Sequence, residues 1–191
     1  MKLRQLEFDV VKKIYEEHLC NDFVPAEQKP LMVLHILMKM GLYHCYGLYE
    51  EDTIKGYAFL CTAKEKDARV ALLDYFVVLK GMRGEGLGSK FLQLIKEEYK
   101  EYDLIIGEVE RVEAAENEED RKIRDKRKEF YLRNGLTITN LSVDLFGEDL
   151  QIYVLPIQRM LEDDVIFNEL SQIYDKMFYE KDIRQKVILS K

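Results

Sequence analysis

The chain has 191 residues and a formal net charge of −7, with 47% hydrophobic and 34% charged residues. A chain of this length and composition can build one compact domain around a hydrophobic core. Its acidic balance argues against a nucleic-acid partner, because proteins that bind nucleic acid usually present a basic surface to the phosphates. Cys20, Cys45 and Cys61 are odd in number and lack metal-ligand spacing. We therefore expect neither a metal site nor a disulfide framework.

Two features bear on location. The longest apolar run, residues 31–40, contains His35 and Lys39. It is shorter than the ~20 apolar residues that a bilayer-spanning helix needs. The first eight residues lack the apolar core of a signal peptide. We expect no membrane association and a cytoplasmic location.

The spacing of apolar residues predicts the secondary structure. The expected strands are, in chain order, 3–8, 43–49, 54–61, 70–79, 104–110, 136–143 and 150–155. The expected helices are 10–19, 31–40, 87–99, 116–134 and one that follows residue 158. Gly135 is expected to end the fourth helix as a C-cap glycine.

This order combines antiparallel hairpins with a strand–helix–strand crossover. It predicts an α/β (α+β) fold with a mixed, mostly antiparallel central sheet flanked by helices. Residues 1–157 are expected to form the main domain, and residues 158–191 to add a C-terminal amphipathic helix. The apolar stripe of that helix, which includes Ile166, Leu170 and Ile173, would pack on the domain or at a homodimer interface.

The most informative segment is a glycine-rich loop at residues 80–89, between the strand that ends in FVV and a helix. Glycine lacks Cβ, so the loop can turn tightly and present its N–H groups to an anion. The start of the helix adds partial positive charge, which favours a pyrophosphate. A dinucleotide GxGxxG motif from Gly84 would need glycine where Ser89 stands. A P-loop needs GK[ST], but Ser89 precedes Lys90, so the signature is absent.

The pattern Arg83-x-x-Gly86-x-Gly88, after the apolar strand LDYFVV, resembles the coenzyme A loop R/Q-x-x-G-x-G/A of the GNAT superfamily of N-acetyltransferases. Further along, the segment FYLRNGL at 130–136 resembles the motif FYxxxGF of the same family, with Leu136 in place of phenylalanine. The element order fits this family over residues 1–156. The asparagine that the family often places before the second motif has no clear counterpart, and Asn117 lies within an acidic run.

The resemblance implies acetyl-CoA as co-substrate, an amine acceptor and no metal. It implies that the backbone of Phe76, Val77 and Val78 pairs with the pantetheine arm of the coenzyme. It also implies that the loop amides hold the pyrophosphate; these belong to Arg83, Gly84, Glu85, Gly86, Leu87, Gly88 and Ser89.

Two residues are candidates for the proton transfers. Tyr131, in the second motif, is interpreted as the acid that protonates the departing thiolate, since a phenol with a pKa of ~10 keeps its proton at neutral pH. The alternative is a core tyrosine. Glu108 is the leading candidate for the base, and a solvated strand end is its alternative. Asp74, inside an apolar strand, is the second candidate base, and water alone is the third option.

The sequence therefore predicts an N-acetyltransferase that moves an acetyl group from acetyl-CoA to a primary amine by direct attack. The alternatives are a catalytically idle domain that binds acetyl-CoA as a sensor or interaction module, and a nucleotide-binding α/β protein. The acceptor stays open among polyamines, amino sugars, small amines and proteins. By resemblance, residues 22–25 and 145–147 shape its choice.

Overall fold

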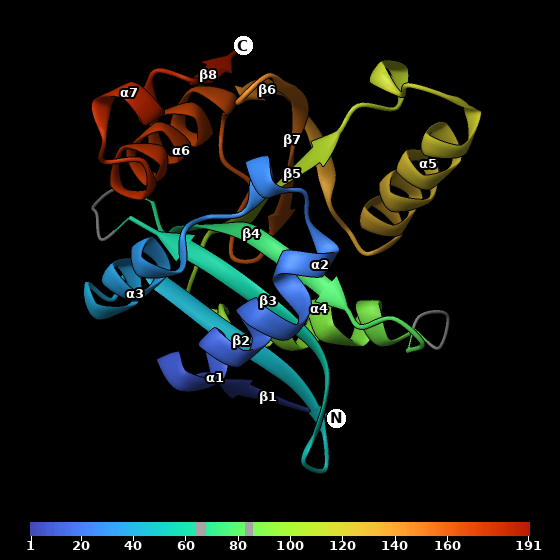
Figure 1. The fold of residues 1–191 in the computed structure, drawn as a ribbon. Helices are drawn as coiled ribbons and strands as arrows, with labels where there is room; N and C mark the ends of the chain where they lie inside the picture. The colour runs from blue at the N-terminus through green and yellow to red at the C-terminus, as the bar shows by residue number, and fades with distance from the viewer. Residues whose placement is uncertain (64–67, 83–85) are drawn as a thin grey trace. The chain divides into compact units, whose positions relative to one another are not determined.

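The computed structural model describes residues 1–63, 68–82 and 86–191 (Figure 1). Its strands form an eight-stranded sheet in the order β1-β2-β3-β4-β5-β7-β6-β8. β4 and β5 are parallel, while the other described registers are antiparallel. The predicted α/β fold with a mixed, mostly antiparallel sheet is confirmed.

The strands are β1 (Lys2–Gln5), β2 (Tyr43–Glu50), β3 (Thr53–Thr62), β4 (Val70–Val78), β5 (Leu104–Glu110), β6 (Thr137–Leu145), β7 (Glu148–Pro156) and β8 (Val187–Ser190). The α-helices are α1 (Phe8–Ile14), α2 (Cys20–Asp22), α3 (Leu31–Lys39), α4 (Leu87–Glu98), α5 (Glu118–Arg133), α6 (Asp163–Met177) and α7 (Lys181–Arg184). A π-helical segment, η1 (Tyr15–Leu19), joins α1 to α2, and the 3₁₀ turns are η2 (Pro25–Glu27) and η3 (Val112–Ala114). None of the helices in the described ranges is long and apolar enough to span a bilayer.

The chain divides into two compact units, and the first comprises Met1–Thr62 and Asp74–Ile95. β2 and β3 form an antiparallel hairpin in it, and Glu51 in the turn has a left-handed φ of 53°. The core of this unit gathers residues from strands and helices alike. Its fully buried members include Val11, Leu34, Leu48, Tyr57, Phe59 and Phe91. The aromatic rings add directional contacts: Phe8 of α1 stacks on His35 of α3, with ring centroids 3.7 Å apart.

The second unit comprises Ala63–Leu73 and Lys96–Lys191. In it, β5 pairs with the first residues of β4 on one side and with β7 on the other. β6 and β7 form a hairpin, and its turn uses left-handed backbone at Phe146 (φ 57°) and Gly147 (φ 96°). β8 adds to β6 at the end of the chain. This strand was not predicted, because four residues are too few to show a clear alternation.

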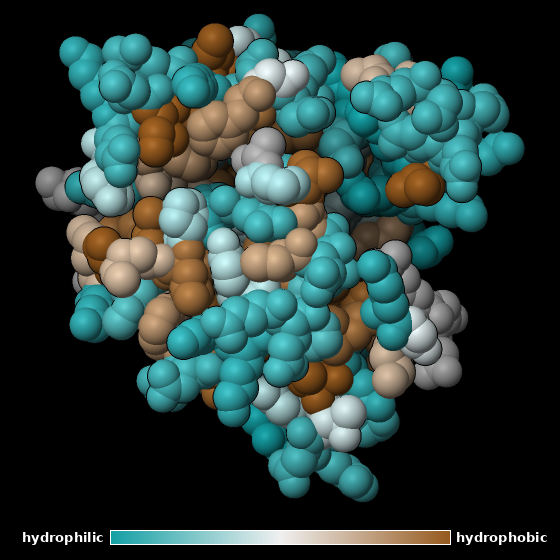
Figure 2. All heavy atoms as spheres, in the orientation of Figure 1, coloured by the Kyte–Doolittle hydropathy of each residue, from teal (hydrophilic) through white to brown (hydrophobic). Residues whose placement is uncertain are grey.

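Two helices of this unit, α5 and α6, bury different amounts of surface. In α6 the apolar stripe is buried, including Ile166, Leu170 and Ile173, and the helix contacts β6 and β8. By contrast, α5 contains no buried residue, and the surface over it is almost entirely hydrophilic (Figure 2). It is held instead by its cap and by ion pairs. Gly135 follows α5 with a φ of 89°, as predicted for a C-cap glycine.

Candidate active site

The predicted pantetheine-binding segment lies in the second half of β4. There the Leu79 amide donates a hydrogen bond to the Lys55 carbonyl oxygen of β3, at 3.0 Å. A Cβ added to Gly56 would lie 2.5 Å from the carbonyl oxygen of Val77, so only glycine lets the two backbones lie this close. Phe76 contacts Phe91 of α4, with ring centroids 5.1 Å apart. Gly56 and Phe91 therefore fix the position of this segment within the first unit.

The register of β4 with β5 covers only the beginning of β4. Val70–Leu73 lie opposite Leu104–Gly107, with Leu73 opposite Gly107 as the last pair. β4 nevertheless continues to Val78. Phe76, Val77 and Val78 thus follow the last residue of β4 in this register.

The glycine loop is described at both of its ends, whereas Arg83, Gly84 and Glu85 lie outside the described residues. Gly81 and Gly86 have left-handed φ values of 84° and 73°, and no atom of the described residues lies within 4 Å of a Cβ added at either. Lys90 N donates to Gly86 O at 3.1 Å, at the start of the helical hydrogen bonds of α4. Leu87, Gly88 and Ser89 form the first turn of α4. The backbone amides in the first turn of a helix have no partner within the helix and can bind an anion. The left-handed backbone of Gly86 and the start of a helix are features that can bind an anion.

Glu108 lies half-buried on β5, opposite Ile152 of β7. The hydroxyl of Tyr174, in α6, donates a hydrogen bond to Glu108 Oε1. Glu110, two residues further along β5, forms an ion pair with Arg127 of α5. Glu108 and Glu110 are two residues apart and therefore lie on the same face of β5. Glu110 is paired with a positive charge, and Glu108 accepts from a neutral phenol.

Tyr131 lies near the end of α5 and is half-buried. Its ring contacts those of Phe130 and Tyr153, with centroids 5.3 and 6.4 Å away. Burial raises the pKa of the Tyr131 hydroxyl above its usual value of 10, and the positive charge of Arg127 opposes this rise. The hydroxyl is therefore protonated at neutral pH, as a general acid must be.

Asp74, the second candidate base, is held by two donors in the first unit. Lys29 Nζ donates to Asp74 Oδ1 at 2.7 Å, and the Tyr43 hydroxyl donates to Asp74 Oδ2. Only 5% of the Asp74 side chain is exposed. Removing one partner of a buried ion pair leaves the other charge buried and uncompensated, so the contact with Lys29 gives Asp74 a structural role.

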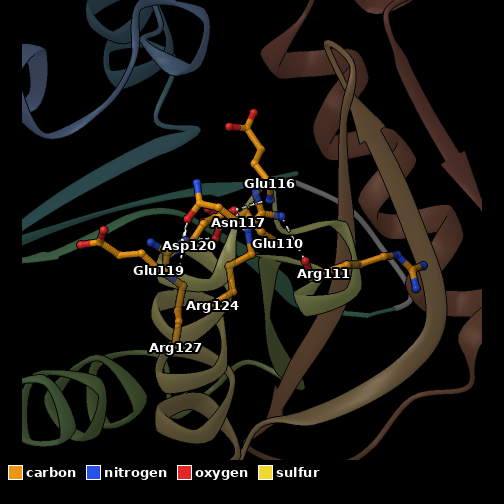
Figure 3. A network of polar contacts seen from close by, with 8 residues as sticks. All are labelled: Glu110, Arg111, Glu116, Asn117, Glu119, Asp120, Arg124 and Arg127. Atoms are coloured by element: carbon orange, nitrogen blue, oxygen red, sulfur yellow. Dashed lines mark hydrogen bonds and ion pairs between the residues drawn. The ribbon is translucent and has the colours of Figure 1, made fainter.

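Asn117, whose role the sequence left open, is the N-cap of α5. Its side-chain oxygen accepts from the amides of Glu119 and Asp120, both at 3.0 Å. Figure 3 shows these residues gathered where β5 is followed by the first turn of α5. The hydrogen bond from Arg124 lowers the pKa of Asp120, and Arg124 Nη1 also donates to the Arg111 carbonyl oxygen at 3.0 Å. The network fixes the start of the helix that carries Tyr131.

Three contacts at the candidate site were not predicted: Lys29 with Asp74, Gly56 with Val77, and Tyr174 with Glu108. Only the contact of Gly56 with Val77 had a signal in the sequence, which is a glycine inside a predicted strand. Within the described part of the chain, no group of three or more His, Cys, Asp or Glu side chains is placed to hold a metal ion.

The sequence and fold match one family of enzymes. Residues 11–131 match the model of the acetyltransferase (GNAT) family. A search of curated proteins finds no match. Among solved structures, a GNAT-family protein of Bacteroides thetaiotaomicron is 20% identical with a TM-score of 0.67, and the match covers 89% of this chain and 93% of that one.

Two further structures are similar at the level of the fold. The ribosomal-protein-S18-alanine N-acetyltransferase of Escherichia coli is 17% identical with a TM-score of 0.59, covering 85% of this chain and 97% of its own. The Salmonella typhimurium protein yncA, solved with acetyl-CoA, is 17% identical with a TM-score of 0.57, covering 86% and 98%. Because the family model matches more than half of the sequence and these structures share its fold, the chain belongs to the acetyltransferase (GNAT) family.

Proposed function

We propose that the protein is an acetyl-CoA-dependent N-acetyltransferase that moves the acetyl group to a primary amine by direct attack. The observation that carries this proposal is the family match over residues 11–131, which contains β4, the glycine loop, α4 and β5 and ends at Tyr131. The left-handed Gly86 and the start of α4 support it, because they suit a pyrophosphate.

In this proposal the coenzyme is bound mainly by backbone groups. The segment of Phe76, Val77 and Val78 adds its peptide groups to those of the pantetheine arm, in the manner of an added strand. The amides of Gly86, Leu87, Gly88 and Ser89 hold the pyrophosphate, together with Arg83, Gly84 and Glu85, which lie outside the described residues. Binding through backbone explains why four of the ten residues at 80–89 are glycines.

The chemistry needs two proton transfers by side chains. When bound, acetyl-CoA supplies an acetyl group activated as a thioester. Glu108 takes the proton that the amine nitrogen loses as it bonds to the acetyl carbon. The Tyr131 hydroxyl gives a proton to the sulfur as the carbon–sulfur bond breaks. The products are an N-acetylated acceptor and coenzyme A with a free thiol, and holding both reactants in line supplies much of the rate.

Coenzyme binding is tested first, by thermal unfolding with and without coenzyme A. A ligand that binds only the folded protein raises the unfolding temperature. Gly86→Glu should abolish the rise, because it places a side chain and a negative charge where the pyrophosphate is proposed to bind. Gly147→Glu is the matched control, since it imposes the same left-handed strain and charge on the β6–β7 turn. A full rise in Gly86→Glu would place the pyrophosphate elsewhere.

Turnover is tested next, by release of the coenzyme A thiol over a panel of amines. The panel holds polyamines, amino sugars, small amines and a peptide with N-terminal alanine; the peptide is included because of the name of the Escherichia coli neighbour. Cys20→Ser is the background for the thiol assay, because Cys20 is exposed. Amine-dependent release is expected for at least one class. Coenzyme binding with no release over the whole panel would support the sensor alternative instead.

A further inference from the structure

The C-terminal helix makes a direct contact with the candidate base. α6 begins at Asp163, well beyond residue 131, where the match to the family model ends. The Tyr174 hydroxyl of this helix donates a hydrogen bond to Glu108 Oε1 on β5. Both residues belong to the second unit. A helix outside the matched family region thus contacts the side chain that we propose takes the proton from the amine.

Tyr174 is held firmly enough to orient a partner. Its side chain is 0% exposed, and Ile173 beside it is fully buried as well. Its ring lies 6.0 Å from that of Phe178, and the Arg184 guanidinium lies 6.0 Å from its centroid. Arg184 is itself fixed by an ion pair of 2.6 Å with Asp175. A buried ring with neighbours on several sides has few rotamers, so its hydroxyl is a fixed donor.

A fixed donor suits a carboxylate base. A glutamate side chain has three rotatable bonds, and without a partner it samples many orientations. A hydrogen bond to one oxygen fixes the plane of the carboxylate and therefore the direction in which it accepts a proton. A neutral phenol does this without the full positive charge that Arg127 places beside Glu110. A neutral donor can therefore orient a carboxylate while favouring its charged form less than a cationic donor does.

We propose that Tyr174 is a positioning residue that orients Glu108 for proton transfer, so that the C-terminal helix forms part of the catalytic machinery. This inference rests on the proposed function, in which Glu108 is the base. It assigns α6 a role in the reaction as well as in packing.

The test compares the pH dependence of kcat/KM in wild type and Tyr174→Phe. The variant keeps the ring and its packing but loses the donor. Because the lost hydrogen bond favoured the charged carboxylate, the acid limb of the profile should move up by about one to two pH units. The pH-independent value of kcat should fall by about tenfold to a hundredfold, because the Glu108 carboxylate is no longer oriented toward the amine. The KM for acetyl-CoA should stay unchanged.

The variant keeps every other ionisable group on these elements and on those beside them. On α6 these are Asp163, Asp164, the buried Glu169, Asp175 and Lys176. The neighbouring groups include the Glu110–Arg127 pair on β5 and α5 and Arg184 of α7. Tyr179→Phe is the matched control, because it removes the hydroxyl of a tyrosine in the same unit that is itself 56% exposed. Its profile should match that of wild type.

A second replacement keeps the test valid if Tyr174→Phe folds poorly. 3-Fluorotyrosine at position 174 keeps the ring and the hydroxyl but makes the hydroxyl a stronger donor. It should move the acid limb in the opposite direction, toward lower pH. An unchanged acid limb in both variants would overturn the inference.

Glu108→Gln, measured in parallel, separates this inference from the proposed function. Loss of turnover in Glu108→Gln with wild-type profiles in both position-174 variants would refute only the role of Tyr174. Full turnover in Glu108→Gln would remove Glu108 as the base and overturn the role of Tyr174 with it.

Discussion

Lys29 Nζ donates a hydrogen bond of 2.7 Å to Asp74 Oδ1, and the two side chains are only 10% and 5% exposed. The same region is fixed by Tyr75, whose hydroxyl donates to the Glu27 carbonyl oxygen at 2.6 Å and accepts from the Lys29 amide at 3.0 Å. These bonds tie the segment before α3 to the middle of β4. They make Asp74 a structural residue of the first unit, and Glu108 is the base that we propose.

Asp74→Asn should therefore destabilise the protein by about 3–5 kcal/mol, since removing one partner leaves the lysine charge buried and unpaired. Asp52→Asn is the control, because Asp52 is 97% exposed in its ion pair with Arg4 and should cost at most about 1 kcal/mol. Urea unfolding of both variants measures the difference. Equal midpoints for the two would show that the Lys29–Asp74 pair does not stabilise the fold.

Gly56→Ala should impair coenzyme binding. The new Cβ would lie 2.5 Å from the Val77 carbonyl oxygen and 3.3 Å from the Phe91 ring, so β4 must shift where it is proposed to bind pantetheine. Overpacking of this kind costs about 1–3 kcal/mol of stability. Gly107→Ala is the matched control on a strand, because among the described residues its Cβ meets Leu136 alone, at an ordinary 3.6 Å. Calorimetry with coenzyme A should show weaker binding for Gly56→Ala alone; equal affinities would contradict the assignment.

Tyr131→Phe should lower kcat and leave the KM for acetyl-CoA almost unchanged. A positioned general acid contributes ~10²–10⁴ in rate, and a thiolate is a fair leaving group, so we expect the lower end. Tyr153→Phe removes the hydroxyl of a neighbouring ring and serves as the control. Initial rates at saturating acceptor measure both. A wild-type kcat in Tyr131→Phe would show that this tyrosine is a packing residue and not the general acid.

Acid should weaken the second unit through Asp103. The hydrogen bond from Arg159 lowers the pKa of Asp103 below its usual 3.8, with help from the Arg69 amide. A carboxyl whose folded-state pKa is depressed stabilises the fold fully above its unfolded-state pKa and loses that contribution as the pH falls through the folded-state pKa. Asp103→Asn should therefore lose less stability than wild type between pH 6 and pH 3. Parallel acid dependence in urea unfolding would refute this.

The sequence predicted what depends on local pattern. Gly135 was expected to end α5 and does so with a left-handed φ, and the order of the main strands and helices followed from apolar spacing. The sequence did not predict side-chain partners that are distant along the chain. Tyr174 and Glu108 are 66 residues apart, and Lys29 and Asp74 are 45 apart. Nothing in the pattern around Asp74 indicates its lysine, which lies in a connecting segment. Such contacts depend on tertiary packing, which periodicity does not encode.

The most direct test of the central claim is transfer of an isotopically labelled acetyl group. The protein is incubated with labelled acetyl-CoA and an amine that gives thiol release, and the acceptor is analysed by mass spectrometry. The account predicts one labelled acetyl group on the amine nitrogen for each coenzyme A thiol released, with loss of both signals in Glu108→Gln. Thiol release without label on the amine, or retained coenzyme with no release for any amine, would contradict it.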